Sequence, residues 1–151
     1  MSDHPLLRPG QPLPRFLGER SGISVVLFFR GSWCPVCRKY LMRIAEQSDE
    51  WRGLGASIIA VSSYALSGSA EDAQLQALDI EYVYDPGAVE ISRLGINHDD
   101  DDHGAIAHPA VLIADSEGTI RYAHVGLHPR DRPEPEAILL AVRRLAEESN
   151  K

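Results

Sequence analysis

The sequence has few cysteines and no long apolar run. Cys34 and Cys37 are its only two cysteines in 151 residues, which excludes a framework of structural disulfides. Apolar runs such as Val25–Phe29 are far shorter than the roughly 20 residues that a membrane-spanning helix needs. Internal repeats are also missing. We therefore expect a single globular domain over residues 1–151 and no membrane partner.

Basic charge is scarce as well. Fifteen lysines and arginines stand against 22 aspartates and glutamates, which gives a formal net charge of −7. An acidic surface repels phosphate backbones, so nucleic acid is excluded as a partner. The N-terminal stretch MSDHPLLRPGQPLP lacks the apolar centre of a signal peptide. We expect a cytoplasmic protein, unless processing has already removed a leader.

Apolar periodicity predicts alternating strands and helices. Runs rich in β-branched residues predict strands over residues 25–29, 57–61, 82–84, 110–114 and 119–125. Helical spacing predicts helices over residues 35–50, 70–79, 87–94 and 134–147. Residues 1–22 read as an irregular segment with a short edge strand near Phe16, and residues 95–108 as a loop that contains Asp99–Asp102.

The order of these elements indicates the fold class. Strand, helix and strand in succession form a right-handed βαβ unit with parallel strands. Asp115 and Gly118 occupy the first and last positions of a type I turn, which predicts an antiparallel hairpin near the C-terminus. We expect an α/β protein, a three-layer α/β/α sandwich with a mixed central sheet.

The motif Cys34-Pro35-Val36-Cys37 lies between the first predicted strand and its helix. With Cys34 as the N-cap and Pro35 as the first helical residue, the free N–H groups of Val36 and Cys37 point toward the Cys34 sulfur. The helix dipole adds roughly half a positive charge there. Nearby cations are Arg30, Arg38 and Lys39. We expect Cys34 to be the attacking thiolate and Cys37 the resolving thiol.

Other interpretations of the pair are a zinc half-site and two inert core cysteines. Zinc needs four ligands and no second Cys-x-x-Cys motif exists, so His98 and His103 would have to complete the site. The same histidines and Asp99–Asp102 could instead hold a divalent cation. Acidic runs are usually solvated, so we expect neither a metal nor a cofactor. For the cysteine pair we favour redox activity, because the motif stands between a strand and a helix.

The chain resembles the thioredoxin-like redoxins, in particular the alkyl hydroperoxide reductase / thiol-specific antioxidant (AhpC/TSA, peroxiredoxin-like) family. The similar segments are Pro9–Phe16, Val26–Cys37, Tyr84–Pro86, Leu94–Ile96 and His108–Tyr122. They occur in the family's order and cover nearly the whole chain. The resemblance implies a thioredoxin-like fold and catalysis by Cys34 and Cys37.

Three positions depart from the patterns of these families. Peroxidases of this superfamily carry Thr or Ser where this chain has Gly31, and a peroxide-polarising Arg where it has Pro109. A proline there is typical of thioredoxins, and it implies a cis-proline that faces the dithiol, with the backbone of His108 beside Cys34. Thioredoxins in turn keep a buried acid where this chain has Phe28. Together the positions favour dithiol–disulfide exchange over peroxide reduction.

The most favoured function is a thiol-disulfide oxidoreductase that cycles the Cys34–Cys37 pair in cell redox homeostasis. One alternative is a peroxiredoxin-like peroxidase, in which Cys37 resolves a Cys34 sulfenic acid. Another is a metal-binding or interaction module without turnover. Expected partners are protein or small-molecule disulfides, or peroxides, together with a recycling thiol reductant, and an oligomer is possible.

Four residues are expected to bind substrate: Trp33, Pro35, His108 and Pro109. Trp33 precedes the nucleophile and reads either as an exposed apolar platform for a partner or as a partly buried packing residue. The His108 ring reads either as a proton-exchange partner of Cys34 or as an exposed side chain.

Overall fold

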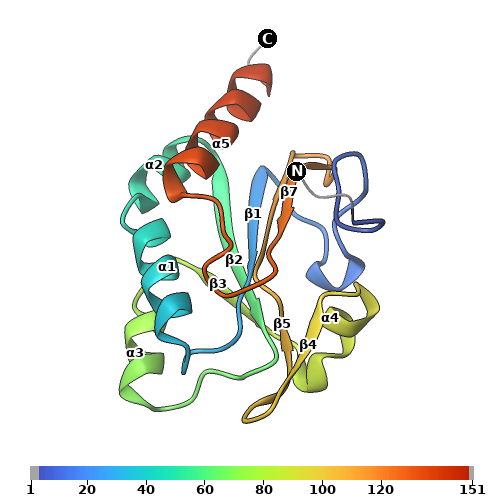
Figure 1. Ribbon diagram of the computed structural model, residues 1–151. Coiled ribbons are helices and arrows are strands. Elements are labelled where there is room, and N and C mark those ends of the chain that lie inside the picture. The colour runs from blue at the N-terminus through green and yellow to red at the C-terminus, as the bar shows by residue number, and fades with distance from the viewer. Residues whose placement is uncertain (1–3, 150–151) are drawn as a thin grey trace.

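A five-stranded mixed sheet forms the centre of the computed structural model, which describes residues 4–149 (Figure 1). Its strand order is β3-β2-β1-β6-β7. The bounds are β1 (Ile23–Phe28), β2 (Ala56–Ser62), β3 (Glu81–Tyr84), β6 (Ala110–Ala114) and β7 (Ile120–Val125). Strands β1, β2 and β3 run parallel, whereas β6 pairs antiparallel with β1 and with β7. The mixed sheet of the sequence analysis is confirmed.

Strand β1 is buried along its whole length because both faces of the sheet are covered. Val25 and Leu27 point into one core, and Val26 and Phe28 into the other. This alternation follows from the two-residue period of a strand. The segment that leads to Cys34–Cys37 therefore starts at the end of β1, in the middle of the sheet, where strands on both sides hold the backbone.

Four helices lie on one face of the sheet (Figure 1). They are α1 (Pro35–Ala45), α2 (Ser48–Gly53), α3 (Ala70–Gln76) and α5 (Pro135–Ser149). The other face carries shorter elements, namely the 3₁₀ helices η1 (Arg15–Leu17) and η2 (Pro86–Ala88) and helix α4 (Val89–Arg93). Leu17 and Ile91 bury this second layer against the sheet, which confirms the three-layer sandwich. Within residues 4–149, no helix has the length and apolarity that crossing a membrane requires.

A second, two-stranded sheet replaces the loop that was expected over residues 95–108. Strand β4 (Asn97–Asp100) pairs antiparallel with β5 (Gly104–Ala107). Ile96 and Ile106 are buried, and Ile96 and Ala107 pack into the second core. The expectation of a solvated loop was wrong, because it rested on the acidic run alone. The apolar residues on either side of that run are buried and anchor the hairpin.

Two further boundaries differ from the sequence analysis. The helix expected over residues 35–50 is divided into α1 and α2, and the buried Trp51 indole N–H donates to the Ile44 carbonyl at 2.8 Å. The same carbonyl accepts a longer bond of 3.3 Å from the Gln47 N–H, so the indole adds a second and shorter bond at the end of α1. The strand expected near Phe16 is the 3₁₀ helix η1, and the pairing near it joins Pro12 to Thr119.

Replacing Trp51 with Phe should destabilise the protein, because the Ile44 carbonyl then keeps only the longer bond from Gln47 and a smaller ring fills the buried site of the indole. We expect a loss of about 1–3 kcal/mol in the free energy of unfolding. Urea unfolding followed by far-UV circular dichroism measures it. Tyr84→Phe is the matched control, since Tyr84 is exposed and its loss should leave the midpoint unchanged. Equal midpoints for both variants would contradict the capping role of Trp51.

Candidate active site

Cys34 is the N-cap of α1, as the spacing of the motif predicts. Its backbone is extended, with φ −89° and ψ 111°, and Pro35 is the first helical residue. The Cys37 N–H donates to the Cys34 sulfur at 3.4 Å, and the Arg38 N–H donates to the Cys34 carbonyl at 3.0 Å. Both cysteines are free thiols and both are buried, Cys34 at 2% exposure and Cys37 at 0%.

These surroundings lower the pKa of Cys34 to about 5. The largest cause is the hydrogen bond that the Cys37 thiol donates to the Cys34 sulfur, and the Cys37 N–H and the Arg30 guanidinium add to it. Burial acts in the opposite direction and is outweighed. The pKa of Cys37 is raised, because a Cys37 thiolate would lose that hydrogen bond and is itself buried. The thiolate therefore resides on Cys34.

Arg30 connects Cys34 to the β4–β5 hairpin. Its Nη1 lies 3.9 Å from the Cys34 sulfur, and its Nη2 donates to Asp100 Oδ1 at 3.2 Å. The other carboxylate oxygen of Asp100 lies 2.8 Å from His103 Nδ1, and His103 holds the pKa of Asp100 below its usual range. Asp100 is thus a structural ion-pair partner in the acidic run, and only the remaining aspartates are exposed.

Trp33 packs inside this network. Its ring stacks on the His103 ring with 3.4 Å between centroids and 2° between planes, and the Arg30 guanidinium lies 5.0 Å from its centroid. Tyr64 contacts the Trp33 ring edge-on and donates its hydroxyl to the His103 carbonyl at 2.7 Å. The structure therefore places Trp33 as a partly buried packing residue, not as the exposed platform considered from the sequence.

Gly31 is required by the position of Trp33. A Cβ at residue 31 would overlap the Trp33 indole nitrogen, and that nitrogen is buried without a hydrogen-bond partner among the described residues. A Thr or Ser at this position therefore conflicts with the packing of the site. The missing hydroxyl and the stacked indole are two aspects of one local arrangement.

Arg132 lies beside Cys37, the expected resolving cysteine, and was missed by the sequence analysis. Its Nη2 is 3.0 Å from the Cys37 sulfur, and its guanidinium lies 5.1 Å from the ring centroid of Tyr40. The Tyr40 hydroxyl donates to the Pro133 carbonyl at 2.6 Å, which fixes the loop that carries Arg132. No sequence signal joins residues 95 positions apart, although the Arg-Pro pair before the last helix marks a rigid approach to it.

The prediction of a cis-proline at position 109 was wrong. No peptide bond within residues 4–149 is cis, so the bond between His108 and Pro109 is trans. The His108 N–H donates to the Ile96 carbonyl at 2.8 Å, and the Pro109 carbonyl accepts from the Gly126 N–H at 2.7 Å. The two residues are an extended link between β5 and β6, and the N–H of His108 is not free to pair with a substrate.

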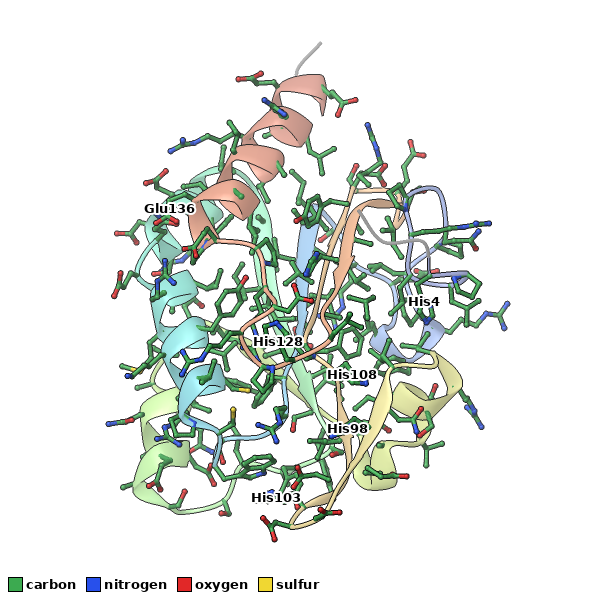
Figure 2. The ribbon with its side chains drawn as sticks, in the orientation of Figure 1. His4, His98, His103, His108, His128 and Glu136 are labelled. Carbon is green, nitrogen blue, oxygen red and sulfur yellow. The ribbon has the colours of Figure 1, made fainter. Side chains whose placement is uncertain are left out.

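His98 and His103, which were considered as ligands of a metal ion, do not converge on one site. The rings of His98 and His108, labelled in Figure 2, lie 5.2 Å apart. Burial and the nearby His98 lower the pKa of His108. The His103 ring instead stacks on Trp33. Across residues 4–149, no three or more His, Cys, Asp or Glu side chains are placed to hold a metal ion.

A small pocket on the Arg30 side of the site holds two of the expected substrate-binding residues. His108 and Pro109 line it together with Arg30, Leu127 and His128. Pro35, which was also expected to bind substrate, lines a different and larger pocket. The structure thus divides the expected substrate contacts between two hollows.

Comparison with known proteins gives the family. A family model for AhpC/TSA matches residues 15–123. The chain belongs to the AhpC/TSA family. It is also 29% identical over 132 residues to the thioredoxin-like protein YneN of Bacillus subtilis (strain 168), which covers 80% of this chain and 73% of that protein. The resemblance stated from the sequence is confirmed, and with it the interpretation of this AhpC/TSA member as a thiol oxidoreductase.

Solved structures show the same fold. Reduced Prx3 from Vibrio vulnificus in complex with hydrogen peroxide superposes with a TM-score of 0.75 at 20% identity, over 89% of this chain and 95% of that one. Peroxidoxin BcpB from Mycobacterium tuberculosis gives 0.71 at 13% identity, over 94% and 97%. AhpC from Enterococcus faecalis gives 0.66 at 19%, over 86% and 80%. The thioredoxin-like architecture of this AhpC/TSA member is therefore confirmed.

The lowered pKa of Cys34 predicts a distinct pH profile for alkylation of the reduced protein. Only the thiolate reacts, so the rate with iodoacetamide should be nearly constant at neutral pH and fall as the pH drops through about 5. Arg30→Gln removes a cation and should move that midpoint up to about 6. Thiolate absorbance at 240 nm and peptide mass mapping measure it. Labelling of Cys37 before Cys34 would reverse the assignment.

Proposed function

We propose that this protein catalyses dithiol–disulfide exchange. The observation that carries the proposal is a Cys34 thiolate at a helix N-cap with Cys37 one turn further along the helix. The thiolate attacks one sulfur of a substrate disulfide, the substrate S–S bond breaks, and the released thiolate takes a proton from solvent. Cys37 then attacks Cys34, the mixed disulfide breaks, and the second substrate thiol leaves. A thiol reductant returns the Cys34–Cys37 disulfide to the dithiol.

Arg132 supports the second of these steps. While Cys34 is a thiolate, its hydrogen bond and its charge keep the proton on Cys37. Once Cys34 is part of a mixed disulfide, that negative charge is gone and the Cys37 sulfur loses its acceptor. The guanidinium 3.0 Å away then stabilises a Cys37 thiolate, because a charge-assisted hydrogen bond in a buried site is strong. Arg132 is in this proposal a positioning residue for resolution.

Peroxide reduction is the second candidate function, and Arg30 is the observation that favours it. A guanidinium 3.9 Å from a buried thiolate could polarise a small peroxide. The two expected donors are nevertheless absent, since residue 31 is a glycine and residue 109 a proline. One donor aimed at developing charge is worth roughly 10²–10³ in rate. The geometry therefore favours disulfides as substrates.

The proposed substrates are small disulfides more than large folded ones. Only 2% of Cys34 is exposed, so a substrate sulfur must enter a narrow opening to line up with the thiolate. The reductant that recycles the enzyme is a thiol, and the proposed compartment is the cytoplasm, where such reductants keep dithiols reduced.

Stopped-flow oxidation of the reduced protein separates the two functions. We expect hydrogen peroxide to react little faster than with an unassisted thiolate of the same pKa, and bis(2-hydroxyethyl) disulfide to be reduced with turnover. Fluorescence reports each step, because Trp33 lies within the Arg30–Cys34 network. Cys34→Ser should abolish both signals. A peroxide rate several orders of magnitude above that of the matched thiolate would place peroxidase activity first.

Substitution of Arg132 tests the role in resolution. Arg132→Gln should slow the second step roughly tenfold to a hundredfold and let the mixed disulfide accumulate, while the first step keeps its rate. Arg132→Lys should restore part of the second step, because its charge remains. Quenched-flow alkylation with mass analysis counts the mixed disulfide. Arg144→Gln, on the exposed face of α5, is the control. An equal slowing of both steps would show that Arg132 only supports the fold.

A further inference from the structure

A pocket of about 360 Å³ lies directly beside the reactive turn. Pro35 and Val36, the two residues between the cysteines, form part of its wall, and Tyr40 adds an aromatic surface from the next turn of α1. The loop after β7 closes the opposite side through Pro129 and Arg132. Arg132 also contacts the Cys37 sulfur, so the pocket and the cysteine pair share one side chain.

The pocket is strongly basic in an acidic protein. Lys39, Arg43, Arg130 and Arg132 line it, and Glu134 is the only carboxylate that does. The whole chain carries a net charge of −7, so this is a local reversal of sign. Glu134 is already occupied, since it pairs with Arg43 at 2.7 Å.

Two of these cations are free to bind a ligand. Lys39 and Arg130 are exposed, and neither forms an ion pair with any residue in the 4–149 range. They come from α1 and from the loop after β7, so they approach the pocket from two sides. Apolar surface lies between them, from Val36 and Tyr40. The arrangement suits a short apolar chain that ends in negatively charged groups.

We propose that this pocket selects small anionic disulfides as the substrates of the Cys34–Cys37 pair. A carboxylate of the substrate lies between Lys39 and Arg130, and its carbon chain packs on the apolar wall. The substrate disulfide is thereby held at the turn that carries Cys34. This inference rests on the proposed disulfide exchange and adds the charge of the substrate to it.

Disulfides that share a two-carbon spacer and differ in the charge of their end groups test the proposal. The series is 3,3′-dithiodipropionate, a dianion, bis(2-hydroxyethyl) disulfide, which is neutral, and cystamine, a dication. We expect kcat/KM to fall in that order at low salt, with the dianion favoured over the neutral compound on the order of tenfold. The preference for the dianion should shrink strongly near about 0.5 M salt, because the Debye length there is only a few Å and the attraction between exposed charges is screened.

Paired variants show whether the pocket is the cause. Lys39→Gln with Arg130→Gln should lower the ratio of kcat/KM for the dianion to kcat/KM for the neutral disulfide roughly threefold to tenfold. The control removes the same two charges elsewhere, as Arg8→Gln with Arg144→Gln, both exposed and distant from the pocket lining. It should keep the wild-type preference. Equal effects of the two pairs would attribute the preference to net charge and overturn the proposal.

Suberate, the carbon analogue of dithiodipropionate, gives a readout that needs no turnover. It should bind with a Kd of about 1 mM or tighter, shift the backbone amide signals of Val36, Lys39 and Arg130, and inhibit reduction of the neutral disulfide. The paired pocket variant should abolish these shifts. Reduction of the neutral disulfide without charge preference or suberate shifts would overturn the pocket alone. Failure to reduce any disulfide, with suberate still bound, would overturn the proposed function and with it the assignment of this anion site to a disulfide substrate.

Discussion

The site depends on one constraint, a negative charge held on the sulfur of Cys34, a residue that is 2% exposed. Burial alone would keep Cys34 protonated, since a buried anion loses its hydration. The Cys37 thiol, the Cys37 N–H and Arg30 replace the lost water and bring the pKa of Cys34 to about 5. Two of these three donors belong to the first turn of α1, so the thiolate requires the helix to begin at this residue. The strand before it, buried on both faces, fixes where that helix begins.

Holding Arg30 against the sulfur requires more of the chain than the motif itself. Asp100 fixes the guanidinium from the β4–β5 hairpin, and His103 fixes Asp100. The Trp33 ring stacks on His103 and also packs against the Arg30 guanidinium. The same ring occupies the space in which a Cβ on residue 31 would lie. The glycine that removes a peroxide-binding hydroxyl is therefore coupled to the packing that orients Arg30. Loss of one donor and ordering of another arise from one set of contacts.

Much of the fold could be predicted because it rests on local patterns. The buried strands, the hairpin closed at Asp115 and the N-cap at Cys34 follow from periodicity and turn chemistry, and each is present. The bond before Pro109 was wrongly predicted to be cis, because that prediction came from the thioredoxin pattern. The bond is trans, and hydrogen bonds to Ile96 and Gly126 hold this link extended. Arg132 and Asp100 could not be assigned because their partners are distant in sequence. Nothing local distinguishes Asp100 from the three aspartates beside it.

The resolving half of the site follows a different electrostatic arrangement from a buried acid. A carboxylate near Cys37 would accept its proton, whereas the Arg132 guanidinium accepts none and acts only on the anion that remains. In the proposed exchange, the proton of Cys37 therefore leaves to the departing substrate thiolate or to water, and the cation makes that loss easier once Cys34 is neutral. This order requires Arg132 to stay in place while the substrate changes. Tyr40 holds the loop at Pro133, and Asp131 holds it through the Leu127 N–H at 2.9 Å. The same loop carries Arg130 to the basic pocket, so a shift that repositioned the substrate-facing cation would also move the cation at Cys37. Substrate charge and resolution are thus coupled through one short segment between β7 and α5.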